Sequence, residues 1–238
     1  APLLHWLSTR VLMHRGRLKM QAVVREVRWQ RGRVEVLGDD FRCRARQAII
    51  TLPLGVLQFG AVRFSPKVGK ESALRRLASG PVIKAALRFP SAFWEKRAPG
   101  VAFFHAPRAA FPTFWTPLPA RAPLLIAWSG GPKAEALGNR DPGAAALTSL
   151  RSIFREVPIP DQVLIQDWAK DPFARGAYSY VLVDGEGARE ELAAPLADTL
   201  FFAGEATSAE DSGTVAGALE SGLRAAREAT WRRGRAAA

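Results

Sequence analysis

The sequence predicts a mixed α/β fold, and three stretches carry that prediction. Residues 17–28 alternate apolar and polar positions, as a half-buried strand does. Residues 70–78 place apolar side chains at helical spacing. Near the end of the chain, an apolar run at 200–203 stops at Gly-Glu, and helical spacing follows from 215 to 226. Strands and helices that alternate along one chain predict mixed sheets covered by helices.

Composition indicates a globular protein of one or two domains. The chain has 238 residues, and 48% of them are hydrophobic, which is enough to bury a core. No apolar run approaches the length of a membrane span, and the first residues lack the charged start and cleavage pattern of a signal peptide. Cys43 is the only cysteine, so no disulfide forms within the chain. A reducing compartment fits, and we expect a cytoplasmic protein.

The net charge of +12, with an isoelectric point near 10.9, fits several anionic partners. Nucleic acid, an anionic membrane and acidic proteins are the classes that such a charge suits. However, the arginines are scattered, with one dense cluster at Arg232, Arg233 and Arg235. A chain rich in Ala, Pro and Arg reaches much of this charge through composition alone, so nucleic-acid binding is not favoured.

The N-terminal part predicts short strands joined by turns. A glycine ends the strand at 17–28, and residues 34–37 suggest its hairpin partner. Gly-Asp-Asp at 38–40 is a second turn. Residues 46–52 then predict a third strand that a proline ends. Neighbouring strands with short connections suit an antiparallel meander.

The middle of the chain predicts more strands and one well-marked helix. Residues 81–89 form an apolar strand, and residues 99–128 contain three short aromatic strands separated by prolines. The Asp-Pro pair that opens 141–156 combines a side-chain cap with proline in the first turn, and we expect the helix to run to about Glu156. Residues 163–168 predict a further strand.

The strand, turn and helix at 200–226 together form the strongest candidate site. A helix N-terminus after a tight turn offers free N–H groups and the positive end of the helix dipole to an electron-rich ligand. Glu205 at the turn suits ligand hydroxyls, because an ionised carboxylate only accepts hydrogen bonds. Gly217, Ala218 and Gly222 leave the helix with a flat face that something bulky must approach. The alternative is an ordinary strand–helix unit with a solvated glutamate, and the pattern alone leaves both open.

Four stretches resemble the flavin-containing amine oxidases, a family that includes monoamine oxidases, polyamine oxidases and lysine-specific histone demethylases. They are Leu200–Leu223, Ile50–Leu57, Val82–Lys84 with Phe93 and Trp94, and Trp168–Tyr180. The four agree with the family in order and spacing, and together they cover most of the chain. The last stretch most resembles the branch of polyamine oxidases and histone demethylases.

The resemblance implies FAD as the cofactor and assigns residues to it. The expected cofactor-binding residues are Val24, Trp168, Tyr178, Gly204, Glu205, Thr214 and Val215. In the family, the Gly-Glu pair contacts the ribityl and phosphate region, and the helix N-terminus faces the isoalloxazine. A valine at the position of Val24 contacts the adenine through its backbone. Trp168 is expected near the flavin ring, although a core tryptophan is the simpler interpretation.

The resemblance also implies three catalytic residues, which are Lys84, Tyr178 and Thr214. Lys84 lies in an apolar run, and the pattern alone favours an outward-facing lysine. The resemblance instead matches it to the lysine that holds a water against flavin N5.

An aromatic wall is expected at Tyr178, which shares a strand face with Tyr180. A pair of core aromatics is the alternative from the pattern alone. By resemblance, Tyr178 is one wall of the amine site, since an aromatic face attracts a cation. Thr214 stands where monoamine oxidases have a second tyrosine, so the resemblance implies a more open site for a larger amine.

The family's domain organisation divides the chain into three segments. Residues 1–52 and 166–238 correspond to parts of the FAD-binding, Rossmann-like domain, and residues 53–165 correspond to the substrate-binding domain. The family's dinucleotide motif, G-x-G-x-x-G, does not occur in this sequence, and Gly185–Glu190 lacks its third glycine. We therefore expect a missing N-terminal flavin-domain half, supplied by a longer gene or by another polypeptide, and weak FAD binding by this chain alone.

The functional expectation is a FAD-dependent oxidase of a small-molecule amine. In the family, hydride passes from the carbon beside the nitrogen to flavin N5, and O2 is reduced to H2O2. The alternatives are an inactive, truncated or interaction module that needs a partner half, and a related flavin desaturase or protoporphyrinogen-type oxidase. His5, His14 and His105 have no metal-ligand spacing, and no G-x-S-x-G elbow occurs, so metal and hydrolase chemistry have little support.

Overall fold

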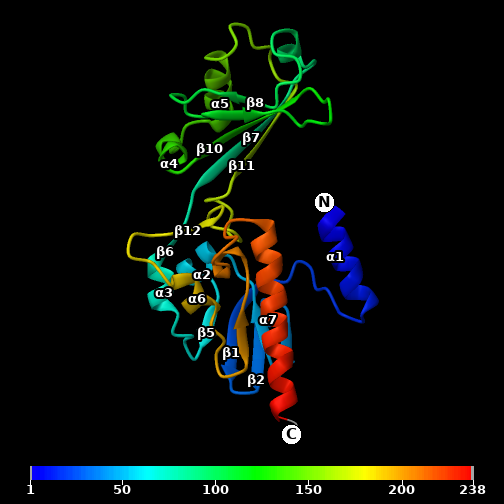
Figure 1. Ribbon diagram of the computed structural model, residues 1–238, viewed down its shortest axis with the longest axis vertical. Coiled ribbons are helices and arrows are strands. Elements are labelled where there is room, and N and C mark those ends of the chain that lie inside the picture. Colours follow the sequence, from blue (N-terminus) through cyan, green and yellow to red (C-terminus); the bar gives the residue numbers. More distant parts are fainter. Residues whose placement is uncertain (1, 237–238) are drawn as a thin grey trace.

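The computed structural model describes residues 2–236 and has two lobes joined at a narrow waist (Figure 1). The upper lobe is built around a five-stranded sheet, and the lower lobe contains both ends of the chain. Side chains are described up to residue 230, so the arginines at 232, 233 and 235 lie outside the described residues. Among the described residues, none of the helices combines the length and apolar character of a membrane span.

The upper lobe contains one antiparallel sheet in the order β11-β7-β10-β9-β8. Its strands are β7 (Val82–Arg88), β8 (Phe103–His105), β9 (Thr113–Trp115), β10 (Leu124–Gly130) and β11 (Gln162–Asp167). Its helices are η1 (Phe93–Lys96), α4 (Pro132–Leu137) and α5 (Pro142–Arg151). Asp141 caps α5, because its carboxylate accepts hydrogen bonds from the N–H groups of Gly143 and Ala144.

The two faces of this sheet differ in their side chains. Alternate residues of β7, such as Ile83, Ala85 and Leu87, lie in the main apolar core, against which α5 packs. The residues between them point to the other face. Lys84 of β7 and Trp128 of β10 are direct cross-strand partners on this second face. The sheet thus presents a lysine and an indole side by side toward the waist of the molecule.

The lower lobe combines three sheets. The largest has the order β3-β2-β1-β5, in which β5 runs parallel to β1 and the other pairs are antiparallel. Its strands are β1 (Val24–Gln30), β2 (Arg33–Gly38), β3 (Arg42–Ala45) and β5 (Arg63–Ser65). Two parallel strands, β4 (Ala48–Ile50) and β13 (Leu200–Phe202), form the second sheet, and β6 (Leu77–Ser79) pairs with β12 (Ser179–Val181) in the third.

Helices surround these sheets (Figure 1). They are α1 (Pro2–Met13), α2 (Leu54–Phe59), α3 (Glu71–Arg76), α6 (Ala188–Ala193), η2 (Glu205–Thr207) and α7 (Val215–Ala236). Helices α2, α3 and α6 share a small apolar core around Leu54, Leu77 and Leu192. Since α2 and α3 pack with α6, the segment from 54 to 79 lies in the lower lobe.

Several predicted boundaries were wrong. The strand expected at 17–28 begins only at Val24, since Gln21 adopts a left-handed φ of 54°, which is incompatible with a strand. The strand expected at 46–52 is shortened to β4 (48–50), which pairs with β13, and the strand that continues the meander is β3 (42–45), which lies before the predicted range. The helix expected to reach Glu156 ends at Arg151.

Candidate functional site

The predicted strand, turn and helix meet at Gly204 and Glu205. Strand β13 is fully buried, and Gly204 follows with φ of 123°, a conformation that favours glycine. Open space lies where a Cβ of Gly204 would stand, so nothing in the described chain fills that position. The N–H of Gly204 donates to Ser221 Oγ of α7 at 2.9 Å. The turn is therefore tied to the helix and presents a bare backbone.

The Glu205 carboxylate lies beside the start of α7, as the sequence predicted. Its Oε2 accepts hydrogen bonds from Gly213 N at 2.8 Å and from Ser179 Oγ at 2.7 Å. Its Oε1 accepts one from Ser179 N at 3.2 Å. The contact to Gly213 confirms that Gly-Glu and the helix N-terminus are neighbours. All these partners are donors, which suits the ionised form of the carboxylate.

A buried arginine supports this carboxylate from behind. Arg189 of α6 is 5% exposed, and its guanidinium donates to Ser179 Oγ at 2.6 Å, Ser179 O at 3.2 Å and Ala206 O at 3.2 Å. Burial lowers the pKa of Arg189, and the charges of Glu205 and Glu190 oppose that shift. No role was predicted for this residue from the sequence, where the stretch from 185 to 190 was considered only as an incomplete dinucleotide motif.

The first turn of α7 is capped by Thr214. Its Oγ1 accepts a hydrogen bond from Gly217 N at 3.0 Å and donates one to Asp211 O at 2.6 Å. Val215, the next residue, is 70% exposed. The Thr214 hydroxyl is thus occupied by the helix cap, and Val215 presents an apolar surface at the helix start.

A cavity of about 230 Å³ opens on the Gly-Glu turn. Its lining includes Trp168, Gly204, Glu205 and Thr207, together with the segment from Ile50 to Leu54. Val24 lies at the beginning of β1, in the apolar cluster that also contains Leu200 and Phe202 of β13. The cavity therefore brings Trp168 next to the Gly-Glu turn. Val24 packs against the apolar cluster that contains β13, the strand before that turn.

Tyr178 links the turn region to the upper sheet. Its hydroxyl accepts a hydrogen bond from Trp128 Nε1 at 3.2 Å, and a Cβ on Gly213 would lie 3.5 Å from its own Cβ. Lys84, the cross-strand partner of Trp128, is half-buried, with its ammonium 5.8 Å from the centre of the Trp115 ring. Lys84 lies at Trp115 and Tyr178 at Trp128, and these two tryptophans stand on the neighbouring strands β9 and β10; they are called the aromatic cluster below.

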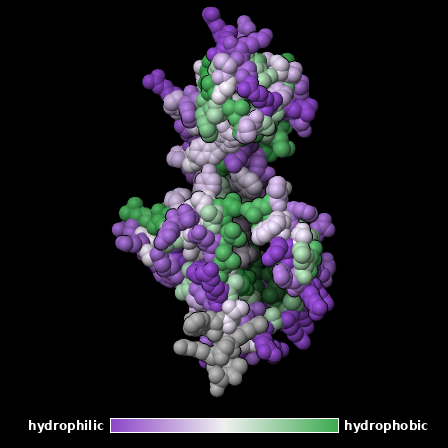
Figure 2. All heavy atoms as spheres, turned by 45° about the vertical axis from the view of Figure 1, so that its right-hand side comes forward, coloured by the Kyte–Doolittle hydropathy of each residue, from purple (hydrophilic) through white to green (hydrophobic). Residues whose placement is uncertain are grey.

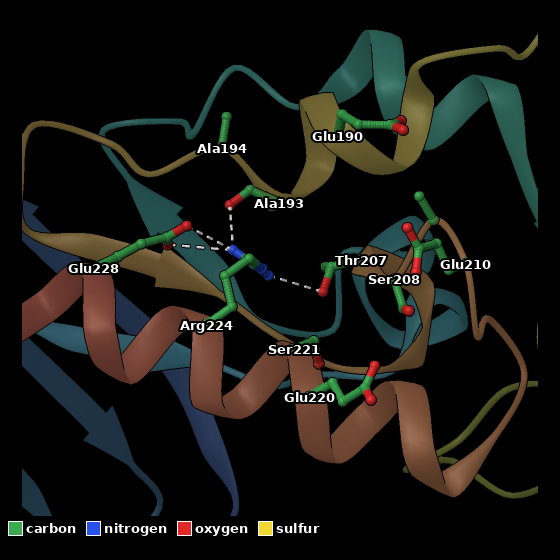
Figure 3. A pocket seen from close by; sticks show the side chains of 11 residues that line it. Glu190, Ala193, Ala194, Thr207, Ser208, Glu210, Glu220, Ser221, Arg224 and Glu228 are labelled. Atoms are coloured by element: carbon green, nitrogen blue, oxygen red, sulfur yellow. Dashed lines mark hydrogen bonds and ion pairs between the residues drawn. The ribbon is translucent and has the colours of Figure 1, made fainter.

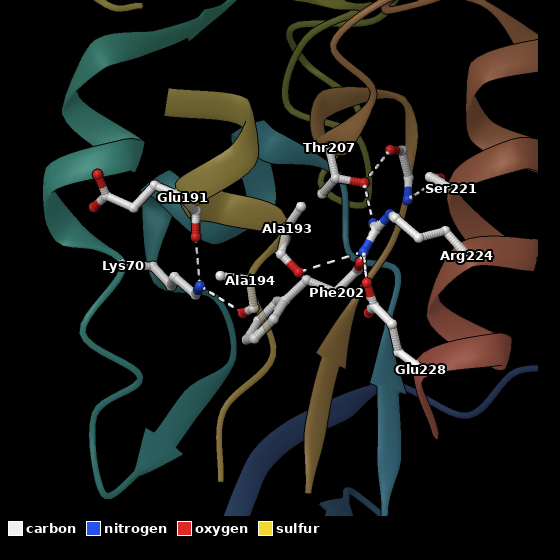
Figure 4. A network of polar contacts seen from close by, with 10 residues as sticks. Lys70, Glu191, Ala193, Ala194, Phe202, Thr207, Ser221, Arg224 and Glu228 are labelled. Carbon is white, nitrogen blue, oxygen red and sulfur yellow. Dashed lines mark hydrogen bonds and ion pairs between the residues drawn. The ribbon is translucent and has the colours of Figure 1, made fainter. Parts of the chain in front are cut away.

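Two cationic side chains donate hydrogen bonds to backbone carbonyls of α6, of the residue after it and of β13 (Figure 4). Lys70 is 4% exposed and donates to the carbonyls of Glu191 and Ala194 at 2.5 and 2.7 Å. Arg224 of α7 donates to Phe202 O of β13 at 2.7 Å and to the Glu228 carboxylate at 3.1 Å. Figure 3 shows Arg224 beside a second cavity, of about 460 Å³, between α6 and α7. These contacts fix β13, which leads into the turn with Glu205, and α6, which carries Arg189.

Metal chemistry finds no support in the part of the chain that the structure describes. No group of three or more His, Cys, Asp or Glu side chains there could hold a metal ion.

Six of the predicted site residues gather into two sets. Gly204, Glu205, Thr214 and Val215 lie at the turn and helix start, and Lys84 and Tyr178 lie around the aromatic cluster.

Comparison with known proteins gives a consistent set of matches. The family model described as "Flavin containing amine oxidoreductase" matches residues 7–230. "Lysine-specific histone demethylase 2" of Homo sapiens is 34% identical over 197 residues, which cover 76% of this chain and 24% of that protein. "Lysine-specific histone demethylase 1 homolog 1" of Oryza sativa subsp. japonica is 35% identical over 219 residues, which cover 85% of this chain and 26% of that protein.

A solved structure of wild-type putrescine oxidase bound to putrescine has the same fold. It superimposes with a TM-score of 0.79 at 21% identity, over 94% of this chain and 51% of that one. The chain thus spans about a quarter of the length of the curated relatives and about half of the oxidase chain.

Proposed function

Because this chain belongs to the family of flavin-containing amine oxidoreductases, we propose that it forms the catalytic part of a FAD-dependent oxidase of a small-molecule amine. When bound, the flavin would accept hydride from the carbon beside the amine nitrogen and return the electrons to O2, giving H2O2. The chain's own residues would bind the cofactor, orient the amine and exclude water from the reacting atoms.

The observation that carries the proposal is the geometry around Glu205. A carboxylate with its charge held by donors lines a cavity, next to a glycine whose Cβ position is empty. The remaining lone pairs of such a carboxylate suit the hydroxyls of a ribityl chain. A bare glycine backbone and a helix N-terminus suit an anionic or electron-rich group. The residues present therefore fit a flavin, with Gly204, Glu205, Thr214 and Val215 as its contacts.

The aromatic cluster supports an amine as the substrate. Tyr178, which accepts a hydrogen bond from Trp128, would form one wall of the amine site, and Trp168, which lines the cavity at the Gly-Glu turn, would lie near the flavin ring. Aromatic faces attract a substrate ammonium through their negative quadrupole. Lys84, half-buried on the same sheet face as Trp128, would hold a water near the reacting atoms.

The domain assignment takes over the family's division of the chain, in which the substrate-binding part includes the segment 54–79 of the lower lobe. We assign residues 1–52 and 166–238 to the flavin-binding part and residues 53–165 to the substrate-binding part. Val24 would contact the adenine through its backbone. The pyrophosphate would be held by a glycine-rich strand–turn–helix that these 238 residues do not contain. That half is the partner which the proposal requires.

Gel filtration with FAD tests the proposal. The chain alone should retain little flavin absorbance, whereas the chain fused to a glycine-rich flavin segment of a related oxidase should retain it and produce H2O2 from an amine. The loss of the main anchor removes a disproportionate share of affinity, because binding is the surplus left after ordering costs. In the fusion, Lys84→Met should keep the flavin and slow amine oxidation.

Two outcomes would contradict the proposal. A fusion that retains no flavin would remove the cofactor role of the Gly-Glu turn. A fusion that retains flavin but oxidises a tetrapyrrole or a carbon–carbon bond instead of any amine would favour the desaturase or protoporphyrinogen-type alternative. A panel with putrescine, benzylamine and a dimethyl-lysine peptide distinguishes the classes of amine.

A further inference from the structure

We propose that Arg189 is the positioning residue of the cofactor site, because it orients Glu205 and Tyr178 at once through Ser179. This inference rests on the proposed function, since it concerns how the flavin-contacting carboxylate and the aromatic wall are held. It depends on three contacts within the described chain: Arg189 to Ser179, Ser179 to Glu205, and Glu205 to Gly213.

The first step is the cost of burying this guanidinium. Arg189 is 5% exposed, and its three hydrogen bonds all end on neutral oxygens, those of Ser179 and Ala206. A buried charge without a direct counter-ion is expensive, and an apolar side chain would fill the same space at lower cost. The guanidinium therefore does something here that packing alone does not need.

The second step is the direction of the Ser179 hydroxyl. A guanidinium has donors and no acceptor, so Ser179 Oγ must accept the hydrogen bond from Arg189. The single hydroxyl proton is then left for Glu205 Oε2, which lies 2.7 Å away. Arg189 thus fixes the direction of the two hydrogen bonds that run from its guanidinium through Ser179 Oγ to Glu205, which we call the Ser179 relay. The Glu205 carboxylate therefore always has the Ser179 hydroxyl as a donor.

The third step is that the same arginine holds the backbone beside Tyr178. Its second terminal nitrogen donates to Ser179 O, while Ser179 N donates to Glu205 Oε1. The peptide that carries Tyr178 is therefore fixed between α6 and the Gly-Glu turn. Glu205 in turn accepts from Gly213, one residue before the cap of α7. Through Ser179, the Arg189 side chain therefore influences the positions of the Glu205 carboxylate, of the neighbouring Tyr178 and of the start of α7.

The experiment is a double-mutant cycle on FAD affinity and on amide exchange. Arg189→Met, Ser179→Ala and the double variant are made in the fusion that carries the glycine-rich flavin segment and are titrated with FAD at equilibrium. Hydrogen exchange of Gly213 and Ser179 is followed without ligand. Arg189→Met should weaken FAD binding by about tenfold, as expected for a hydrogen-bonded charge, and speed exchange at Gly213. In the Ser179→Ala background, Arg189→Met should have little further effect on either readout.

Arg76→Met is the matched control. Arg76 of α3 also holds α6, through Glu191 and the Glu186 carbonyl, but it has no contact with the Ser179 relay. It should lower thermal stability and leave FAD affinity and Gly213 exchange unchanged. Arg189→Lys should fall between the wild type and Arg189→Met, because an ammonium keeps the charge and loses the planar fork.

The outcomes separate this inference from the proposed function. If the fusion with an otherwise wild-type chain shows no FAD binding at any concentration, the cofactor role fails, and Gly213 exchange alone decides the positioning role. If Arg189→Met weakens FAD binding equally in the wild-type and Ser179→Ala backgrounds, the relay is wrong. If only thermal stability changes, Arg189 is a packing residue and the inference is overturned.

Discussion

The five-stranded sheet of the upper lobe and the paired strands β4 and β13 of the lower lobe differ in how completely their surroundings are covered. The upper sheet buries one face in a single large core, with Phe93 in edge-to-face contact with Phe89, Trp94 and Phe154. The lower lobe divides its apolar side chains among three smaller clusters. Apolar surface also gathers in the middle of that lobe in Figure 2.

Several exposed apolar residues of the lower lobe lie on elements near the candidate site. They include Ile49 of β4 and Val215, Leu219 and Leu223 of α7, all at least 41% exposed. Polar groups near the site are held by hydrogen bonds from three cationic side chains, those of Arg189, Lys70 and Arg224. The comparison teaches that stability is concentrated in the upper core, whereas the lower lobe holds polar groups in place and leaves apolar surface free for contact.

The largest expected effect comes from truncating the same residue type in each region. Leu87→Ala, in the upper core, should lower the free energy of unfolding by about 2–5 kcal/mol, because a buried leucine leaves a cavity. Leu219→Ala, at 43% exposed, should cost less than about 1 kcal/mol. Urea unfolding followed by circular dichroism measures both. Equal losses at the two positions would contradict the comparison.

A smaller effect is expected where the lower lobe depends on a polar contact. Lys70→Met should destabilise the chain by about 1–3 kcal/mol, because the Glu191 and Ala194 carbonyls lose their donor in a buried place (Figure 4). Lys67→Met, on the same loop but exposed, is the control and should be near neutral. A Lys70→Met variant as stable as the wild type would mean that the ammonium contributes nothing net.

The pH dependence of stability, compared between the wild type and Lys70→Met, tests whether burial disfavours the charged form of Lys70. Burial lowers the pKa of Lys70 from its ordinary value, and the charge of Glu191 opposes the shift. The unfolded chain therefore binds more protons between the folded pKa and the ordinary one, and stability rises with pH across that window. The wild type should gain stability relative to Lys70→Met as the pH is raised toward 10.5. Parallel melting curves would contradict this.

Local signals in the sequence predicted the upper lobe well. An apolar run predicted β7, and the Asp-Pro pair predicted the start of α5, since both signals depend on residues close together in the chain. The separation of β3 from β4 was missed, because it depends on pairing with β13, about 150 residues later. No local pattern distinguishes a strand that continues a meander from one that leaves it.

The candidate site divides in the same way. The Gly-Glu turn beside the helix start was predicted from the sequence and confirmed by the contact of Glu205 with Gly213. Arg189 was missed because a buried arginine looks like any surface arginine until its partners are known. The hydroxyl of Thr214 caps α7, a local role that the sequence analysis did not predict, and the expectation of a more open amine site at Thr214 stays a prediction. The roles of Lys84 and Tyr178 in catalysis stay predictions.

The smallest expected effect tests the ionic side of the comparison, in the sheet around β1. Glu26 accepts hydrogen bonds from Arg63 at 2.8 Å and Arg28 at 3.0 Å, which lower the pKa of its carboxyl to about 2. A depressed carboxyl pKa contributes stability above the unfolded value near 4.5, and that contribution is lost as the pH falls from 4.5 toward 2. Both arginines are largely exposed, so salt should weaken the effect.

Glu26→Gln should therefore flatten the acid limb of the stability curve of the lower lobe. Urea midpoints at pH 6, 4.5 and 3 measure it, at low and high salt, with the exposed Glu156→Gln of the upper lobe as the control. The difference between the wild type and Glu26→Gln should be largest at pH 6 and become smaller at pH 3, because the unfolded carboxyl is protonated below 4.5 and the stabilising contribution is lost as the pH falls toward 2. A stability difference between the two proteins that stays constant with pH would show that Glu26 acts through packing. The stability of the lower lobe would then depend on charge no more than that of the upper lobe.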